Sequence, residues 1–161
     1  MHRAAPWFGL AAGIVVADQL SKWAILASFA PGERLRLTGY FNLVLAYNKG
    51  AAFSFLAAAP GWQTPLFVGV ALIAVAVVSA LLLRSRGRRL FCAGLALILG
   101  GAVGNVVDRL RFGHVVDFLD FHALGWHWPA FNVADSAITV GAALLIIESF
   151  VQRNSGDAHG R

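Results

Sequence analysis

Apolar residues fall into four long runs along the chain, at residues 7–29, 62–83, 90–108 and 131–151. A helix that crosses a membrane needs about 20 mostly apolar residues, and each run is close to that length. The last three runs are almost continuously apolar, so length rather than periodicity favours helix over strand. We therefore predict an all-α membrane protein, with residues 1–161 forming a single integral membrane domain of four transmembrane helices.

The first run needs a separate test because it also resembles a secretory signal peptide. Asp18, Gln19 and Lys22 interrupt the run where a small-residue cleavage site is expected, and apolar sequence resumes after them. A cleaved signal peptide has the opposite order, with small residues after its apolar core. The pattern therefore favours a helix that stays in the mature protein.

The segments between the runs predict two outer loops, at about residues 30–61 and 109–130, and a disordered tail at 152–161. Apolar and polar residues partly alternate over 34–47, which is typical of short strands. Residues 51–59 are apolar and are stopped by Pro60 and Gly61, which predicts a short helix lying in the membrane interface.

Basic residues set the expected orientation. The link at 84–89 carries four arginines, and further arginines lie at position 3 and at positions 153 and 161. With four spans these three regions share one side of the membrane, and short loops rich in Lys and Arg stay in the cytoplasm. Both termini are therefore predicted to be cytoplasmic.

Composition agrees with lipid as the solvent. Hydrophobic residues make up 58% of the chain and charged residues 13%, with a mean hydropathy of +0.69, against roughly 45–50% and 25% in globular proteins. This composition excludes intrinsic disorder, and the lone Cys92 excludes a disulfide scaffold. The net charge of +5 is read as a topology signal, so nucleic acid is not an expected partner.

Ionisable residues inside a span are costly and usually face the protein interior. Asp18 and Lys22 are four residues apart, which allows an ion pair on one helix face. This pair is either a structural clamp or part of substrate binding. Asn105, Asp108 and Arg109 end the third run, and they serve either helix packing with an ion pair at the interface or the positioning of a catalytic group.

Two further acids are expected to meet at the outer membrane boundary. Asp117 has apolar neighbours on both sides, which predicts a position at membrane depth or in a shallow re-entrant loop, whereas Asp120 is expected to be solvated or bonded to backbone. Asn132 is a plausible N-cap of the fourth helix, which places Asp135 at its third position. Two close carboxylates share one proton, so one can activate water while the other protonates a carbonyl oxygen.

From these residues alone, an aspartyl protease and a small proton-coupled transporter have equal support. A structural subunit of a larger membrane complex is a third possibility. A zinc site built from His114, His122 and His127 with Asp120 matches no strong ligand spacing, so no metal and no cofactor are expected.

Five motifs in order along the chain change this balance: Asp18-Gln-Leu-Ser-Lys22, the segment 47–54, the segment 100–109, Val116-Asp117-Phe118 and the segment 131–136. Together they resemble bacterial lipoprotein signal peptidase, or signal peptidase II. The resemblance implies four spans with a small extracytoplasmic β-cradle and a short interfacial helix. It also implies removal of the signal peptide from diacylglyceryl-modified prolipoproteins, with cleavage just before the lipidated cysteine.

The resemblance also assigns residues. It implies that Asp117 and Asp135 are the catalytic pair of an aspartic endopeptidase, without a metal. It implies a multi-pass protein of the bacterial inner membrane, with its active site near the outer leaflet, and partners limited to the lipid-modified substrate and membrane lipid. A monomer is expected, and residues 51–59 are a candidate lid. The substrate-binding or supporting residues, with Asp108 added from its place beside Arg109, are Asp18, Lys22, Asn48, Gly50, Asn105, Asp108, Arg109 and Asn132.

Overall fold

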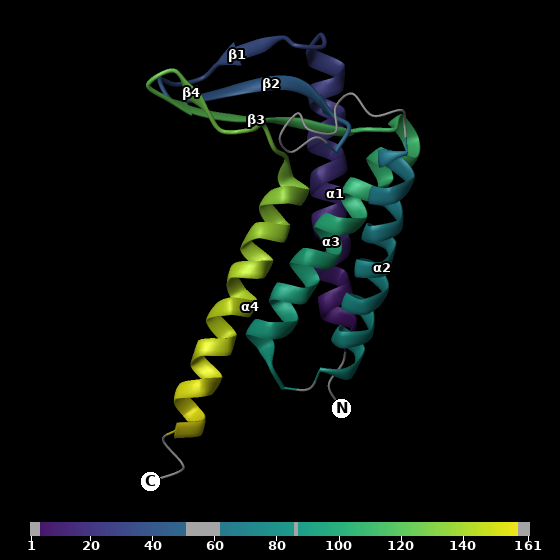
Figure 1. Cartoon of the computed structure of the whole chain (residues 1–161), viewed down its shortest axis with the longest axis vertical. Coiled ribbons are helices and arrows are strands. Elements are labelled where there is room, and N and C mark those ends of the chain that lie inside the picture. Colours follow the sequence, from purple (N-terminus) through teal and green to yellow (C-terminus); the bar gives the residue numbers. More distant parts are fainter. Residues whose placement is uncertain (1–3, 51–61, 86, 158–161) are drawn as a thin grey trace.

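The computed structural model describes residues 4–50, 62–85 and 87–157, and it consists of a helical bundle with a small sheet across one end (Figure 1). The start of the first helix, the end of the fourth helix and the facing ends of the second and third helices lie at the other end of the bundle. The helices are α1 (Ala5–Ser28), α2 (Gln63–Arg84), α3 (Arg89–Phe112) and α4 (Val133–Asp157), and the strands are β1 (Arg34–Arg36), β2 (Phe41–Asn48), β3 (Val115–Ala123) and β4 (Trp126–His127).

Within the described residues, all four helices are long and apolar enough to cross a membrane. The four predicted spans are therefore confirmed, although their ends differ. The third helix continues past residue 108 to Phe112, and Gly113 ends it with a φ of 74°. The fourth helix continues to Asp157, into the segment 152–161 for which disorder was predicted.

Helix α3 lies at the centre of the bundle and packs against α1, α2 and α4. Its approach to α4 depends on Gly94 and Gly141. A Cβ on Gly94 would lie 2.8 Å from the carbonyl oxygen of Gly141, and a Cβ on Gly141 would lie 2.6 Å from that of Gly94. Small residues let membrane helices pack backbone to backbone, so the two glycines fix the spacing of the helices that carry most of the polar groups.

The sheet is antiparallel in the order β1-β2-β3-β4. Strands within 34–47 were predicted and are confirmed, but β3 and β4 lie in a loop for which none was predicted. The reason is that β3 is almost fully buried over Val115–Asp120, so it lacks the alternation of a strand with one solvated face. The predicted interfacial helix at 51–59 lies outside the described residues.

A cluster of buried apolar side chains joins the sheet to the bundle. Ile25 near the end of α1 packs with Leu45 of β2 and with Val116 and Phe118 of β3. These side chains are almost completely buried. This contact fixes β3 on the end of α1. It therefore also fixes the position of Asp117, which lies between Val116 and Phe118, relative to the helices.

Candidate active site

Asp135 lies in the first turn of α4, where Asn132 caps the helix. The Oδ1 atom of Asn132 accepts a hydrogen bond from the N–H of Asp135 at 2.9 Å, and Oδ2 of Asp135 accepts one from the N–H of Asn132 at 3.3 Å. This reciprocal arrangement is a capping box. The predicted N-cap and the predicted third position are both confirmed, and the cap fixes the carboxylate of Asp135.

Asp117 lies within β3. Of the two placements predicted for it, the re-entrant loop was therefore wrong, and the position at membrane depth stays a prediction. Its Oδ1 accepts a hydrogen bond from Nδ2 of Asn132 at 2.7 Å, and its Oδ2 accepts one from Nδ2 of Asn48 at 3.0 Å. The residue is 2% exposed. Because Asn132 bonds to both acids, it brings Asp117 and Asp135 together although 18 positions separate them in sequence.

Backbone groups dictate which way two of these amides point. The Oδ1 atom of Asn48 accepts the N–H of Gly50 at 2.8 Å, and that of Asn132 accepts the N–H of Asp135. An amide has one acceptor end and one donor end, so both NH₂ groups must face Asp117. The carboxylate therefore receives two donors, and neither can turn without breaking a backbone hydrogen bond.

Asn105 of α3 provides the corresponding donor to Asp135. Its Nδ2 lies 2.8 Å from Oδ1 of Asp135, while its Oδ1 accepts from Nζ of Lys22 at 3.2 Å and Nδ2 of Asn132 at 3.3 Å. The lysine ammonium has no acceptor, so it forces the oxygen of Asn105 toward itself. Each of the four carboxylate oxygens thus accepts one N–H hydrogen bond.

Burial and charge place the titration of Asp117 near neutrality. Burial and the neighbouring Asp135 raise the pKa of Asp117 to about 7, against the hydrogen bonds from Asn48 and Asn132 and the charge of Lys22, which lower it. Two adjacent carboxylates ionise in separate steps. The carboxyl of Asp117 therefore gains or loses its proton near neutral pH, which is the property that a general acid or base needs.

Below the pair lies a buried ion cluster made of Asp18, Lys22 and Asp108. Nζ of Lys22 is 2.8 Å from Asp18 and 2.8 Å from Asp108, and all three side chains are at most 2% exposed. The predicted pair of Asp18 and Lys22 is present, but Asp108 pairs with Lys22 rather than with the adjacent Arg109.

The cluster also holds the backbone of the two elements that carry the acids. Asp18 accepts the N–H of Ala134 at 2.9 Å, and Asp108 accepts the N–H of Val116 at 3.0 Å. These neighbours directly precede Asp135 and Asp117. Because fully buried side chains offer no surface to a substrate, the geometry favours the clamp over substrate binding for Asp18 and Lys22.

Sequence reasoning missed Gln19 in this cluster. Its Nε2 donates to Asp108 at 2.9 Å and to Asp18 at 3.2 Å. A polar amide next to an acid inside an apolar run was the available signal, since such groups need partners in lipid.

Gly50 and Arg109 both lie against the ring of Phe67 on α2. Gly50 has a φ of +99°, and a Cβ there would run into the Phe67 ring. The guanidinium of Arg109 lies 5.4 Å from the centre of the same ring and within electrostatic range of Asp117 and Asp135. The predicted residues are therefore placed around the pair, while Phe67 was not predicted.

Asp120 differs from its prediction because it is buried and bonded to side chains. Asn42 donates to it at 2.7 Å, and Nδ1 of His127 lies 2.8 Å away. Burial raises its pKa, but these two hydrogen bonds and the charges of His127 and Arg34 outweigh burial and leave the pKa below its usual value. Neighbours in a strand alternate between faces, so Asp120 lies on the face opposite Asp117.

The histidines considered for zinc are spread along the sheet. His114 packs on Tyr47 with ring centres 4.2 Å apart, whereas His122 stacks on His127 at 5.0 Å. Within the part of the chain that the structure describes, no three His, Cys, Asp or Glu side chains are grouped to hold a metal ion.

The two acids open into different hollows. Asp117 borders one of about 290 Å³ that is also lined by Asn48 and Lys49. Asp135 borders one of about 450 Å³ that is otherwise mostly apolar. Pro129 and Ala130 line both hollows. The pair is therefore accessible from a polar side and from an apolar side.

The chain is similar to one known protein family along most of its length. The family model described as signal peptidase (SPase) II matches residues 10–151. A lipoprotein signal peptidase from Ralstonia nicotianae is 61% identical over 147 residues, covering 91% of this chain and 85% of that protein. Another, from Paraburkholderia phytofirmans, is 57% identical over 144 residues, covering 89% and 84%.

Solved structures show the same fold. One bacterial membrane enzyme superposes with a TM-score of 0.82 at 27% identity, covering 94% of this chain and 91% of that chain. A second superposes with a TM-score of 0.77 at 29% identity, covering 89% and 91%.

Proposed function

The chain belongs to the signal peptidase II family, and on that premise we propose that Asp117 and Asp135 make it an aspartic endopeptidase. The protein is a peptidase that removes signal peptides from prolipoproteins. The cut falls just before the cysteine that carries a diacylglyceryl group. Nothing in the fold or the comparisons favours the proton-coupled transporter.

The observation that carries the proposal is the sharing of Asn132 by two acids whose four oxygens all accept N–H donors. Such donors hold the carboxylates in place and leave the remaining lone pairs for water and substrate. The pKa of about 7 for Asp117 supports Asp117 as the acid that carries the proton before the reaction begins.

The reaction then has two halves, and each half needs two proton transfers. Asp135 takes a proton from water as the water oxygen attacks the scissile carbonyl carbon, and Asp117 gives its proton to the carbonyl oxygen. In the second half, Asp135 passes its new proton to the cysteine nitrogen and the C–N bond breaks. A hydroxyl of the intermediate returns a proton to Asp117 as the new carboxylic acid forms, so both acids end as they began.

The protein lies in the bacterial inner membrane, as its family and its four apolar helices indicate. The end of the bundle that carries the sheet and the two acids is the outer end, so the active site lies near the outer leaflet surface with both termini in the cytoplasm. Support comes from the arginine-rich facing ends of α2 and α3, which lie at the same end of the bundle as the start of α1 and the end of α4 (Figure 1). A monomer is proposed as the active form, because all four oxygens of the two acids find a hydrogen-bond donor within the chain itself.

The test is cleavage of a diacylglyceryl-modified prolipoprotein by the purified protein in detergent, with EDTA present. We expect cleavage before the lipidated cysteine, no effect of EDTA, and no cleavage of the same precursor without its lipid. Cleavage elsewhere in the chain, or loss of activity with EDTA, would refute the proposed reaction. Proton-driven uptake by liposomes that contain the protein would support the transporter instead.

A further inference from the structure

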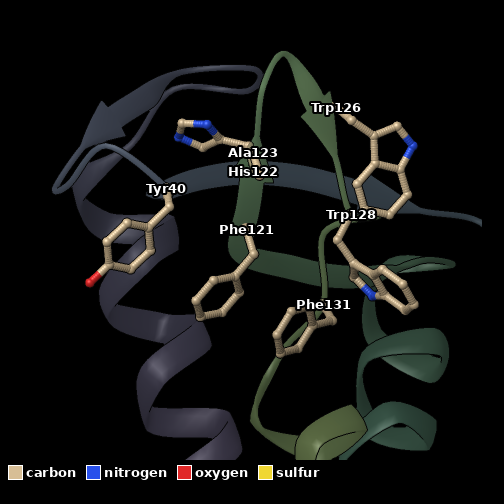
Figure 2. A pocket seen from close by; sticks show the side chains of 7 residues that line it. All are labelled: Tyr40, Phe121, His122, Ala123, Trp126, Trp128 and Phe131. Carbon is tan, nitrogen blue, oxygen red and sulfur yellow. The ribbon is translucent and has the colours of Figure 1, made fainter.

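The face of the sheet that looks toward the helices carries a further hollow of about 420 Å³, which is lined mainly by aromatic residues. We call it the aromatic cup. Figure 2 shows the rings of Tyr40, Phe121 and Phe131 on the helix side of β3, while the imidazole of His122 points the other way. Trp126 and Trp128 complete the cup with ring centres 5.7 Å apart. Among the described residues that line it, none is charged.

The cup lies on the same face of β3 as the catalytic pair. Side chains alternate along a strand, so Phe121, four residues after Asp117, points to the same side. At about 3.3 Å per residue the two lie roughly 13 Å apart along the strand. A substituent next to the scissile bond would therefore reach the cup if it carried a hydrocarbon chain longer than roughly 13 Å.

The cup adjoins the apolar hollow beside Asp135, which we call the α4 hollow. Trp128 and Phe131 line both of them. In the α4 hollow, the hydroxyls of Ser136 and Thr139 donate to backbone carbonyl oxygens at 2.9 Å and 2.8 Å, so both side chains have their hydrogen bonds satisfied within the helix. We call the two adjoining hollows together the apolar trough, and Trp128 and Phe131 lie where they meet.

The trough offers little to a peptide backbone. The N–H of Trp128 bonds to the carbonyl oxygen of Phe121 at 2.8 Å, and the N–H of Phe131 bonds to that of Leu119 at 3.1 Å. Paired backbone groups leave an extended peptide without partners, and burying its polar groups unpaired is costly. Hydrocarbon needs no such partners. The hollow beside Asp117, with Asn48 and Lys49, suits the polypeptide better.

We propose that the aromatic cup and the α4 hollow are together the subsite for the diacylglyceryl group of the substrate cysteine, with one acyl chain in each limb. The inference rests on the proposed function, which places this group beside the scissile bond. The glycerol lies where the two hollows meet, near Trp128 and Phe131. The other acyl chain lies in the α4 hollow, along Thr139 and Val140.

Filling either limb tests the assignment. Ala123→Trp fills the cup and Thr139→Trp fills the α4 hollow. Neither side chain bonds to the carboxylate of Asp117 or Asp135, and the hydroxyl of Thr139 donates only to the backbone oxygen of Asp135. With a dipalmitoylglyceryl precursor we expect each variant to raise KM about tenfold at nearly constant kcat, equivalent to lost contact with about two methylene groups. With a diacetylglyceryl precursor, whose chains are too short to fill the limbs, KM stays close to that of the wild type.

Matched controls place tryptophan on the same elements outside the trough. Leu124→Trp lies at the fully exposed tip of the hairpin, and Ile146→Trp lies further along α4. Both are expected to leave KM for the two precursors unchanged. An equal rise of KM for both chain lengths, or no rise for either, would contradict the subsite.

A second measurement does not depend on cleavage. The double variant Asp117→Asn, Asp135→Asn is mixed with a peptide whose cysteine carries a diacylglyceryl group with diazirines on the acyl chains, and labelled residues are mapped by mass spectrometry. Labels within 121–140 that Ala123→Trp and Thr139→Trp suppress would support the subsite. Labels confined to other surfaces would overturn it, even if the wild type cleaves its substrate. If the wild type fails to cleave but labelling stays in 121–140, the proposed function fails and the lipid site remains.

Discussion

Two groups of buried acids differ in what faces them. Asp18 and Asp108 each lie 2.8 Å from the ammonium of Lys22. Asp117 and Asp135 accept N–H groups, and among the described residues no lysine or arginine forms an ion pair with either. A cation in contact favours the charged carboxylate, whereas burial beside a like charge favours its protonated form. The first group is thus suited to be a fixed ion, and the second to exchange a proton.

The difference also explains why both groups are needed. The ion cluster bonds to the N–H groups of Ala134 and Val116, each directly before one acid of the pair. It therefore sets the relative position of α4 and β3. Because the ion cluster already holds α4 and β3 together, the groups that contact Asp117 and Asp135 can be neutral amides.

Removing either acid of the pair is the largest expected change. Asp117→Asn and Asp135→Asn should each lower kcat by roughly 10⁴-fold, the upper range for acid–base catalysis, while the protein still inserts and melts as the wild type does. Cleavage assays and thermal unfolding in detergent measure both effects.

Asp120→Asn is the matched control, because it removes a buried acid from the same strand on the opposite face. It should keep most of the activity. Full activity in either variant of the pair would abolish the contrast between the two groups.

Removing the cation of the ion cluster comes second. Lys22→Met leaves two buried carboxylates without a counter-charge, which should cost about 3–5 kcal/mol of folding free energy. Thermal unfolding followed by helical signal checks this loss.

The triple variant Asp18→Asn, Lys22→Met, Asp108→Asn makes the cluster neutral and should recover part of the stability. If Lys22→Met melts at the wild-type temperature, the cluster is not the brace that its geometry indicates.

The pair should give activity a pH dependence centred near neutrality. Because the pKa of Asp117 is about 7, its proton is lost above that pH, and kcat should fall about tenfold per pH unit on the alkaline side. The raised pKa also means that its contribution to stability is complete below pH 3.8 and is lost as the pH rises through about 7. A pH profile of kcat without an alkaline fall between 6 and 9 would refute the shared proton.

The smallest expected effect concerns one donor. Asn48→Ala removes a hydrogen bond that lowers the pKa of Asp117, so the alkaline fall should move upward by about one pH unit. Asn42→Ala removes the corresponding donor to Asp120, and it should leave the pH of the alkaline fall unchanged. A downward shift for Asn48→Ala would mean that the amide does not donate to the pair.

The sequence predicted the helices better than the sheet. Apolar runs of the right length identify spans, because a backbone in lipid must form all its hydrogen bonds internally, as a helix does. Strand β3 carries no comparable signal, since Val115, Val116 and Phe118 are buried on both sides of the strand. Asp120 was misplaced for the same reason, because its partner Asn42 lies on β2 and strand pairing was not predicted.

The sequence by itself determined the solvent, the number of spans, the N-cap at Asn132 and the choice of Asp117 and Asp135, because these depend on composition, local spacing and motifs. Tertiary structure alone decided which groups meet. Lys22 is four residues from Asp18 but 86 from Asp108, and it contacts both. Contacts between distant segments arise from how α3 packs on α1 and α4, and no local pattern encodes that packing. The scarcity of charge identified the membrane, and the fold determined which acids contact a lysine and which accept only N–H groups of amides and the backbone.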